Sequence, residues 1–167
     1  MPSKKSTKIQ QIFFLTMLLF IFIGENVAQD HEHDHEHHGT HNELAVGGGI
    51  VYSSEAPGLA PAFHVHAIKG LTPVVGIGAG YELILGDEVH QSITALLNLK
   101  PTPMLDINVG PGIVLPTPDE PWSLLLNVET ALVWPLGERY HIGPVLDFGW
   151  SQHGIHVIAG AHVGIHF

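Results

Sequence analysis

The last fourteen residues of the chain, Gly154 to Phe167, read GIHVIAGAHVGIHF. Every second residue from Ile155 onward is apolar, and the residues between them are histidine, glycine and one isoleucine. Successive side chains of a β-strand point to opposite faces, so this stretch predicts a strand with one apolar face and one face of histidine and glycine. An apolar face repeated on every strand is too large for a small core and is typical of strands that face lipid.

Seven more segments between Asn42 and Ser151 show the same alternation. They are Glu43–Ser53, Ala62–Lys69, Val74–Leu85, Glu88–Leu99, Met104–Leu115, Trp122–Leu136 and Arg139–Ser151. Their lengths are close to the ~9–11 residues that a tilted strand needs to cross a bilayer, and an even strand number is typical of single-chain outer-membrane barrels. We therefore predict an all-β fold, an eight-stranded antiparallel up-and-down transmembrane β-barrel over residues 42–167.

Aromatic and proline residues refine this prediction. Aromatic residues lie near the ends of the apolar faces, as expected for girdles at the two membrane interfaces; they are Tyr52, Phe63, Trp122, Trp134, Tyr140, Trp150 and Phe167. Pro111 and Pro144 lie in the middle of predicted strands. A closed barrel has no free edge where a missing backbone donor is harmless, so we expect β-bulges at both prolines.

Residues 1–29 have the features of a secretory signal peptide. Lys4, Lys5 and Lys8 form a basic start, residues 12–23 are almost all apolar, and Ala28 precedes a suitable cleavage point. The apolar run is shorter than the ~20 residues that a membrane-spanning helix needs. The mature chain is therefore expected to begin near residue 30.

Residues 30–41 read DHEHDHEHHGTH and contain no residue that could form a hydrophobic core. This composition predicts a disordered tail. Imidazole is a ligand for Zn, Cu and Ni, and nearby carboxylates add oxygen donors. We predict that the tail collects such ions through His31, His33, His35, His37, His38 and His41. The alternative is a solvated leader that binds metal only as any histidine-rich peptide does.

Charge and composition exclude several classes of function. The net charge is −10, only 13% of the residues are charged, and cysteine is absent. After removal of the signal peptide the basic residues are Lys69, Lys100 and Arg139. Nucleic acid is therefore not expected as a partner, whereas cations are. Without cysteine there is neither a disulfide framework nor a thiolate metal site.

The connections between the predicted strands differ in charge. If the mature chain starts in the periplasm, the connections near Glu55, Asp87 and Glu120 face outward and carry most of the acidic residues that lie in connections, with Glu138 the exception. The three basic residues border the opposite, periplasmic turns, where we expect them to meet lipid phosphates.

Several short stretches resemble a known type of barrel. They are FHVH at 63–66, GIGAGYE at 76–82, NVGPG at 108–112, HIGP at 141–144 and HVGIHF at 162–167. With them the mature chain resembles the small eight-stranded outer-membrane barrels of Gram-negative bacteria, and more narrowly a subgroup with a histidine-rich leader. The resemblance implies an outer-membrane location, and the terminal Phe167 resembles the signal read by the barrel-assembly machinery. It implies no activity, so function must come from the residues themselves.

The inward faces of the predicted strands hold most of the chemistry. An eight-stranded barrel is just wide enough for its side chains to fill, so these groups should lie close together. Their members are Glu43, His64, His66, Glu82, His90, Asn98, Asp106, Asn108, Asn127, Glu129, His141, Asp147, His156, His162 and His166. Hairpin geometry predicts an outer group of His64, His66, Glu82 and His90. A second, inner group would join Arg139, His141, His162, His166 and Glu43.

Two functions fit this pattern. In the first, the barrel binds divalent transition-metal ions (Zn, Cu or Ni) through the tail and the outer interior group, in metal homeostasis or transport. In the second, it is a structural or interaction barrel whose interior is a plug of mutually paired charges. No catalytic motif is present, and Ser92 beside His90 on one face is a weak basis for a nucleophile, so we do not expect an enzyme. We expect a monomer in contact with outer-membrane lipid.

Overall fold

The computed structural model describes residues 42–54, 58–118 and 120–167. The predicted signal peptide and the histidine-rich tail, including His31 to His41, lie outside these residues, so the predictions for them stay predictions. Within the described part, no helix is long and apolar enough to cross a membrane.

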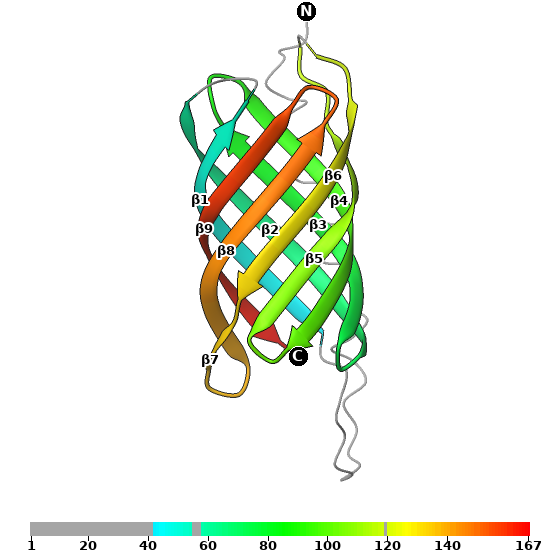
Figure 1. Ribbon diagram of the computed structural model, residues 1–167, viewed down its shortest axis with the longest axis vertical. Coiled ribbons are helices and arrows are strands. Elements are labelled where there is room, and N and C mark those ends of the chain that lie inside the picture. The colour runs from blue at the N-terminus through cyan, green and yellow to red at the C-terminus, as the bar shows by residue number, and fades with distance from the viewer. Residues whose placement is uncertain (1–41, 55–57, 119) are drawn as a thin grey trace, which may run out of the picture. The chain divides into compact units, whose positions relative to one another are not determined.

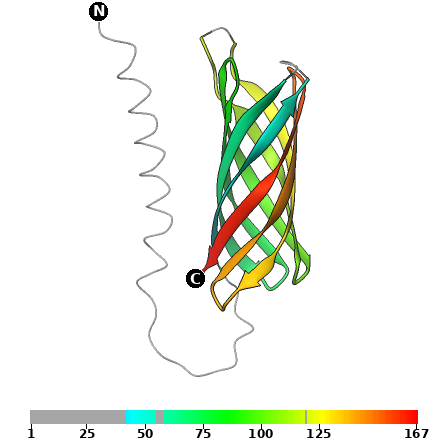
Figure 2. The ribbon, with the colours of Figure 1, turned by 90° about the vertical axis from the view of Figure 1, so that its left-hand side faces the viewer.

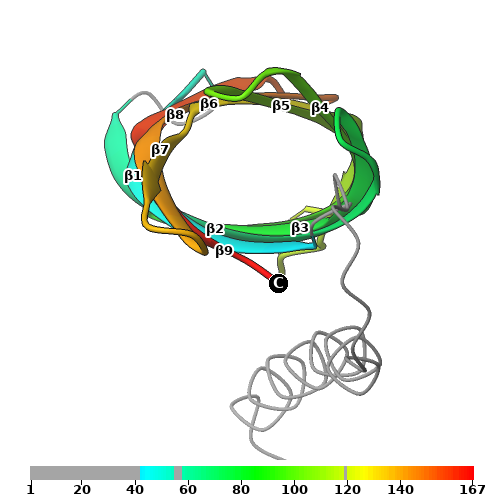
Figure 3. The same ribbon diagram turned by 90° about the horizontal axis from the view of Figure 1, so that it is seen from below.

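The described chain is a closed antiparallel β-barrel. Its strands are β1 (Glu43–Ser53), β2 (Leu59–Thr72), β3 (Val75–Leu85), β4 (Val89–Thr102), β5 (Leu105–Val114), β6 (Ser123–Leu132), β7 (Trp134–Leu136), β8 (Tyr140–Ser151) and β9 (Ile155–His166). Consecutive strands pair from β1 to β6 and from β7 to β9, and the β1–β9 and β6–β8 pairings close the ring seen in Figure 3. β6 and β7 pair with β8 in one continuous register and are one strand interrupted at Val133. The barrel thus has eight strands, as predicted.

The ends of the strands alternate between two rims. The connections β2–β3, β4–β5 and β7–β8 lie at the rim that also holds both ends of the barrel chain. There Asn42 and Phe167 exchange two backbone hydrogen bonds of 3.1 and 3.0 Å. We call this the terminal rim; it is the lower end in Figure 1 and the end where the C-terminus lies in Figure 2. The opposite end, with the β1–β2, β3–β4, β5–β6 and β8–β9 connections, is the loop rim.

The predicted alternation of faces is confirmed along the strands, apart from the three-residue β7, which is exposed throughout. Large apolar side chains are exposed on the outer surface, and they include Phe63, Leu126, Leu146 and Trp150. Histidine, asparagine and carboxylate side chains are buried inside. Water would not tolerate so large an apolar surface, whereas lipid requires it. The exterior is therefore that of a membrane-embedded barrel.

The predicted bulges at Pro111 and Pro144 are wrong. Pro111 stays in register with Leu126 and Pro144 stays in register with Ala161. In the described ladders, register shifts occur only near turns, between Gly70 and Thr72 and between Leu99 and Thr102.

Glycine explains how the prolines remain in register. Each proline follows a glycine, Gly110 or Gly143. A Cβ at Gly110 would overlap the Ala95 carbonyl of β4, and a Cβ at Gly143 would overlap the Leu132 carbonyl of β6. Each of these carbonyls faces a proline, which has no N–H to donate to it. The carbonyl lies instead against the backbone of the preceding glycine, which has no side chain. The strand keeps its register because the neighbouring backbone can approach closely.

This close approach predicts the effect of adding a methyl group. Gly143→Ala and Gly110→Ala should each destabilise the barrel by about 1–3 kcal/mol, the usual cost of overpacking, because the obstructing atoms are backbone. Unfolding in denaturant, followed by tryptophan fluorescence of the refolded barrel, measures the change. Gly86→Ala is the matched control, since its Cβ would meet no atom closer than 3.4 Å. Equal stabilities of all three variants would contradict the explanation.

Candidate metal centre in the barrel interior

The barrel interior is rich in buried charge of one sign. Among the described residues, five carboxylates are buried there, Glu43, Glu82, Asp106, Glu129 and Asp147. In the same part of the chain, the basic side chain that pairs with these carboxylates is Lys100. Its Nζ lies 2.8 Å from Glu43 and 3.5 Å from Asp106. Buried carboxylates need a counter-charge, so protons on histidine or bound cations must supply what one lysine cannot.

Three groups of histidine and carboxylate side chains lie along the interior. Within each group the nearest ligand atoms all lie within 4.8 Å of one another. The terminal group, at the terminal rim, is Glu43, His141 and His166. The central group is His64, His66 and Glu129, and the loop-side group is Glu82, Asp147 and His156.

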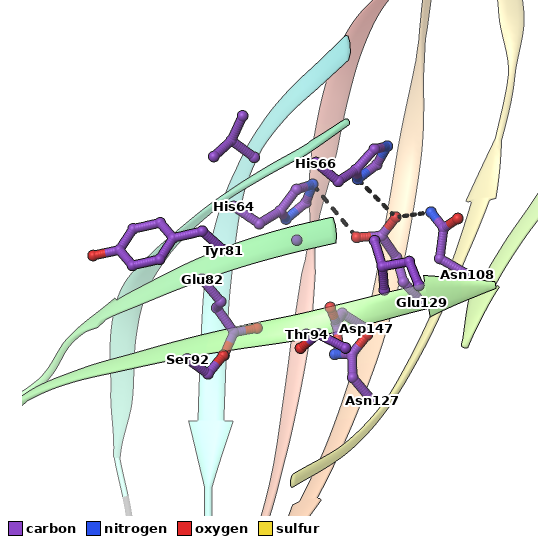
Figure 4. Close-up of a pocket in the computed structure, with 13 residues that line it drawn as sticks. His64, His66, Tyr81, Glu82, Ser92, Thr94, Asn108, Asn127, Glu129 and Asp147 are labelled. Atoms are coloured by element: carbon purple, nitrogen blue, oxygen red, sulfur yellow. Dashed lines mark hydrogen bonds and ion pairs between the residues drawn. The ribbon is translucent and has the colours of Figure 1, made fainter. Parts of the chain in front are cut away.

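The central group joins strands on opposite sides of the barrel. His64 and His66 project from β2, and their rings stack with centroids 6.0 Å apart. Glu129 projects from β6, with one oxygen 3.6 Å from His64 Nε2 and the other 3.6 Å from His66 Nδ1. Figure 4 shows both imidazoles turned toward this carboxylate. All three residues are buried, and a cavity of about 20 Å³ lies beside them, enough for about one water-sized species.

His64 is the least satisfied member of the central group. Its exposed fraction is 8%, and neither ring nitrogen has a hydrogen-bond partner among the described residues. By contrast, Glu129 accepts a hydrogen bond of 2.9 Å from Asn108, which in turn accepts one from Asn98. A buried nitrogen lone pair without a donor opposite it is costly, and a metal ion is one group that would use it.

Glycine makes room for the imidazole rings. His64 faces Gly47 across the β1–β2 pair, and His66 faces Gly80 across β2–β3. A Cβ on Gly47 would overlap the His64 ring. Small residues of β1 and β3 therefore flank these histidines.

The carboxylate of the terminal group is already paired with a lysine. Glu43 Oε2 accepts the 2.8 Å bond from Lys100, and its Oε1 lies 3.4 Å from His66 and 3.6 Å from His141. His141 Nδ1 and His166 Nε2 are 3.0 Å apart, so one of them donates to the other. Arg139 lies beside this group, as predicted, because its backbone carbonyl accepts a 2.8 Å hydrogen bond from the His166 N–H, but it is exposed and the cation bonded to Glu43 is Lys100. Lys100 therefore points inward, and the expectation that all three basic residues meet lipid phosphates fails for it.

The outer group predicted from the sequence is divided between two places. His64 and His66 lie together, but their carboxylate partner is Glu129. Glu82 faces His64 in the β2–β3 register and pairs with His156 at 3.2 Å. His90 is diagonal to Glu82, which faces Ser92, and His90 belongs to none of the three described groups.

Two features of the interior were not predicted from the sequence: the inward position of Lys100, and the contact of Glu129 with the β2 histidines. Lys100 shares the inward alternation of His90 and Asn98 along one strand, so period-two counting would have placed it inside. Glu129 was correctly placed on the inward face, but its contact with β2 crosses the barrel. Hairpin geometry describes neighbouring strands only and gives no signal for such a contact.

Comparison with known proteins identifies the fold. No protein-family model and no curated protein matches the sequence. Among solved structures, Ail of Yersinia pestis matches with a TM-score of 0.57 and 11% identity over 77% of this chain and 99% of Ail. The N-terminal barrel domain of Pseudomonas aeruginosa OprF matches with a TM-score of 0.55 and 14% identity over 77% of this chain and 100% of that domain. Neisserial surface protein A matches with a TM-score of 0.53 and 11% identity, over 76% of this chain and 96% of that protein.

The charge network predicts a loss of stability when its lysine is removed. Lys100→Met leaves Glu43 and Asp106 without their ammonium partner and should destabilise the barrel by about 1–3 kcal/mol, less than for a fully buried pair because Lys100 is partly exposed. Denaturant unfolding measures this change. Adding Glu43→Gln should restore part of the loss, and Lys69→Met, at an exposed position, is the control. A loss that Glu43→Gln fails to reduce would argue against the charge explanation.

The strand order, the apolar exterior and the matched structures together give one conclusion: the chain has the fold of the small eight-stranded outer-membrane β-barrels.

Proposed function

We propose that this outer-membrane barrel binds a divalent transition-metal ion of the Zn, Cu or Ni class in its interior, as part of metal homeostasis or transport. The observation that carries the proposal is the central group, in which buried His64 and His66 converge on Glu129 from across the barrel. The ion would be bound by imidazole nitrogens of His64 and His66 and by the Glu129 carboxylate, leaving a coordination position for water.

The spacing of the central group suits such an ion. Two ligands bonded to one tetrahedral Zn²⁺ at ~2.0–2.1 Å lie about 3.3 Å apart. The His64–Glu129 and His66–Glu129 separations of 3.6 Å, one to each carboxylate oxygen, are close to that value, and one ligand atom from each of the three residues lies within 4.8 Å of the other two. Two imidazoles and one carboxylate match the ligand preference of these metals. Asn108, which donates to Glu129, would orient the carboxylate from outside the metal's ligand shell.

The histidine-rich tail supports the same function at a second place. The tail provides imidazoles close together in the sequence that could bind one ion, at His31, His33, His35, His37, His38 and His41. In this proposal the tail collects ions in the periplasm, and the central group binds them within the barrel. The competing function is a barrel whose interior is a structural plug and whose metal affinity, if any, resides in the tail.

Metal titration separates the two functions. The mature protein, refolded in detergent, is titrated with Zn²⁺ and Cu²⁺ by calorimetry in a form whose six tail histidines are replaced by serine. We expect a stoichiometric interior site to remain. His64→Gln with His66→Gln should weaken its affinity at least ~100-fold, as expected when two of three protein ligands are lost.

The chain provides its own control for this experiment. His90→Gln also removes an inward histidine, but His90 lies outside the central group, so we expect unchanged affinity. Loss of all stoichiometric binding with the tail histidines would contradict an interior site and favour the plug. Equal effects of the His90 variant and the His64/His66 variant would show that the structure assigns the wrong ligands.

A further inference from the structure

The loop-side group brings two carboxylates together, and no lysine or arginine of the described chain pairs with them. Glu82 comes from β3 and Asp147 from β8, and His156 comes from β9. Glu82 is 7% exposed and Asp147 is 3% exposed. The lysine that the structure places inside is bonded to Glu43 and Asp106, carboxylates outside this group.

The bonds that do reach these carboxylates leave one oxygen unused. Asn127 donates a 2.7 Å hydrogen bond to Asp147, and His156 Nε2 lies 3.2 Å from Glu82 Oε1. Glu82 Oε2 is buried and has no hydrogen-bond partner among the described residues. Two buried carboxylates that share so small a space repel each other unless a positive species lies between them.

We infer that Glu82, Asp147 and His156 form a second cation site, distinct from the central group, whose ligands suit a harder divalent ion such as Mn²⁺. Two carboxylates and one imidazole form an oxygen-rich ligand set, and carboxylate ligands suit Mn²⁺ better than do the two imidazoles of the central group. The terminal group does not qualify, because Lys100 already neutralises its carboxylate. This second site does not depend on metal binding by the central group.

The two sites are close neighbours. Glu82 and Asp147 line the same cavity as His64, His66 and Glu129, and Figure 4 shows all five around it. The interior would therefore change from a nitrogen-rich to an oxygen-rich ligand set over a short distance. Such a pair of sites would sort ions by ligand preference, since geometry and ligand type rather than raw affinity distinguish divalent metals.

Mn²⁺ is the probe for the experiment. The refolded mature protein is titrated with Mn²⁺, and free Mn²⁺ is counted from its electron paramagnetic resonance signal. We expect Glu82→Gln with Asp147→Asn to lose one bound equivalent per chain, or to weaken it at least ~10-fold. Asp106→Asn is the matched control, because this carboxylate is also buried but is paired with Lys100, and it should leave Mn²⁺ binding unchanged.

Thermal stability gives a second readout that does not rely on counting ions. Without metal, the Glu82→Gln/Asp147→Asn variant should be as stable as the natural chain or more stable, because it removes the repulsion. Added Mn²⁺ should raise the melting temperature of the natural chain and not that of the variant.

Two outcomes would overturn the site. Unchanged Mn²⁺ binding in the double variant would show that Mn²⁺ binds at another place in the protein. A natural chain that neither binds nor is stabilised by Mn²⁺ would indicate that a shared proton neutralises the two carboxylates.

A His64→Gln/His66→Gln variant that keeps Mn²⁺ binding but loses Zn²⁺ binding would show the two sites to be separate. Failure of one proposal is therefore distinguishable from failure of the other.

Discussion

Backbone hydrogen bonding in lipid is the constraint on which this structure depends. A strand that faces hydrocarbon cannot leave its N–H and C=O groups to water, so every strand needs two neighbours and the sheet must close. The β1–β9 and β6–β8 pairings provide that closure. Closure then fixes the rest: one face of each strand meets lipid, and the other meets a narrow interior that side chains must fill. The polar chemistry of the protein is concentrated inside because the outside has no place for it.

The interior also explains the choice of residues. Histidine can be neutral or positively charged, so it is suited to a buried space with five carboxylates and one lysine. A glycine opposite a histidine leaves room for the imidazole ring, as Gly47 does for His64. The three groups differ in the cation available to them: Lys100 bonds to Glu43 at the terminal rim, whereas the central and loop-side groups contain histidine and carboxylate side chains only.

Period-two alternation predicted most of the fold, because it follows directly from strand geometry. It placed β1 at Glu43–Ser53 and assigned the inward residues, including Glu129 and His156. It failed where a proline or glycine was taken to end a strand or to cause a bulge. The second strand continues through Pro61 and Gly70, and Pro111 and Pro144 remain in register because a preceding glycine admits the neighbouring backbone. The sites were harder to predict, since contacts across the barrel, such as His64 with Glu129, depend on closure and not on sequence neighbours.

The cross-barrel origin of the central group links occupancy to folding. β2 and β6 are separated by three strands on one side of the ring and by three on the other, so their side chains meet only when the ring is complete. A species that binds His64, His66 and Glu129 together has affinity for the closed barrel and little for an open sheet. By mass action, its concentration would then set how strongly closure is favoured, and the lifetime of the assembled barrel would follow the supply of its ligand.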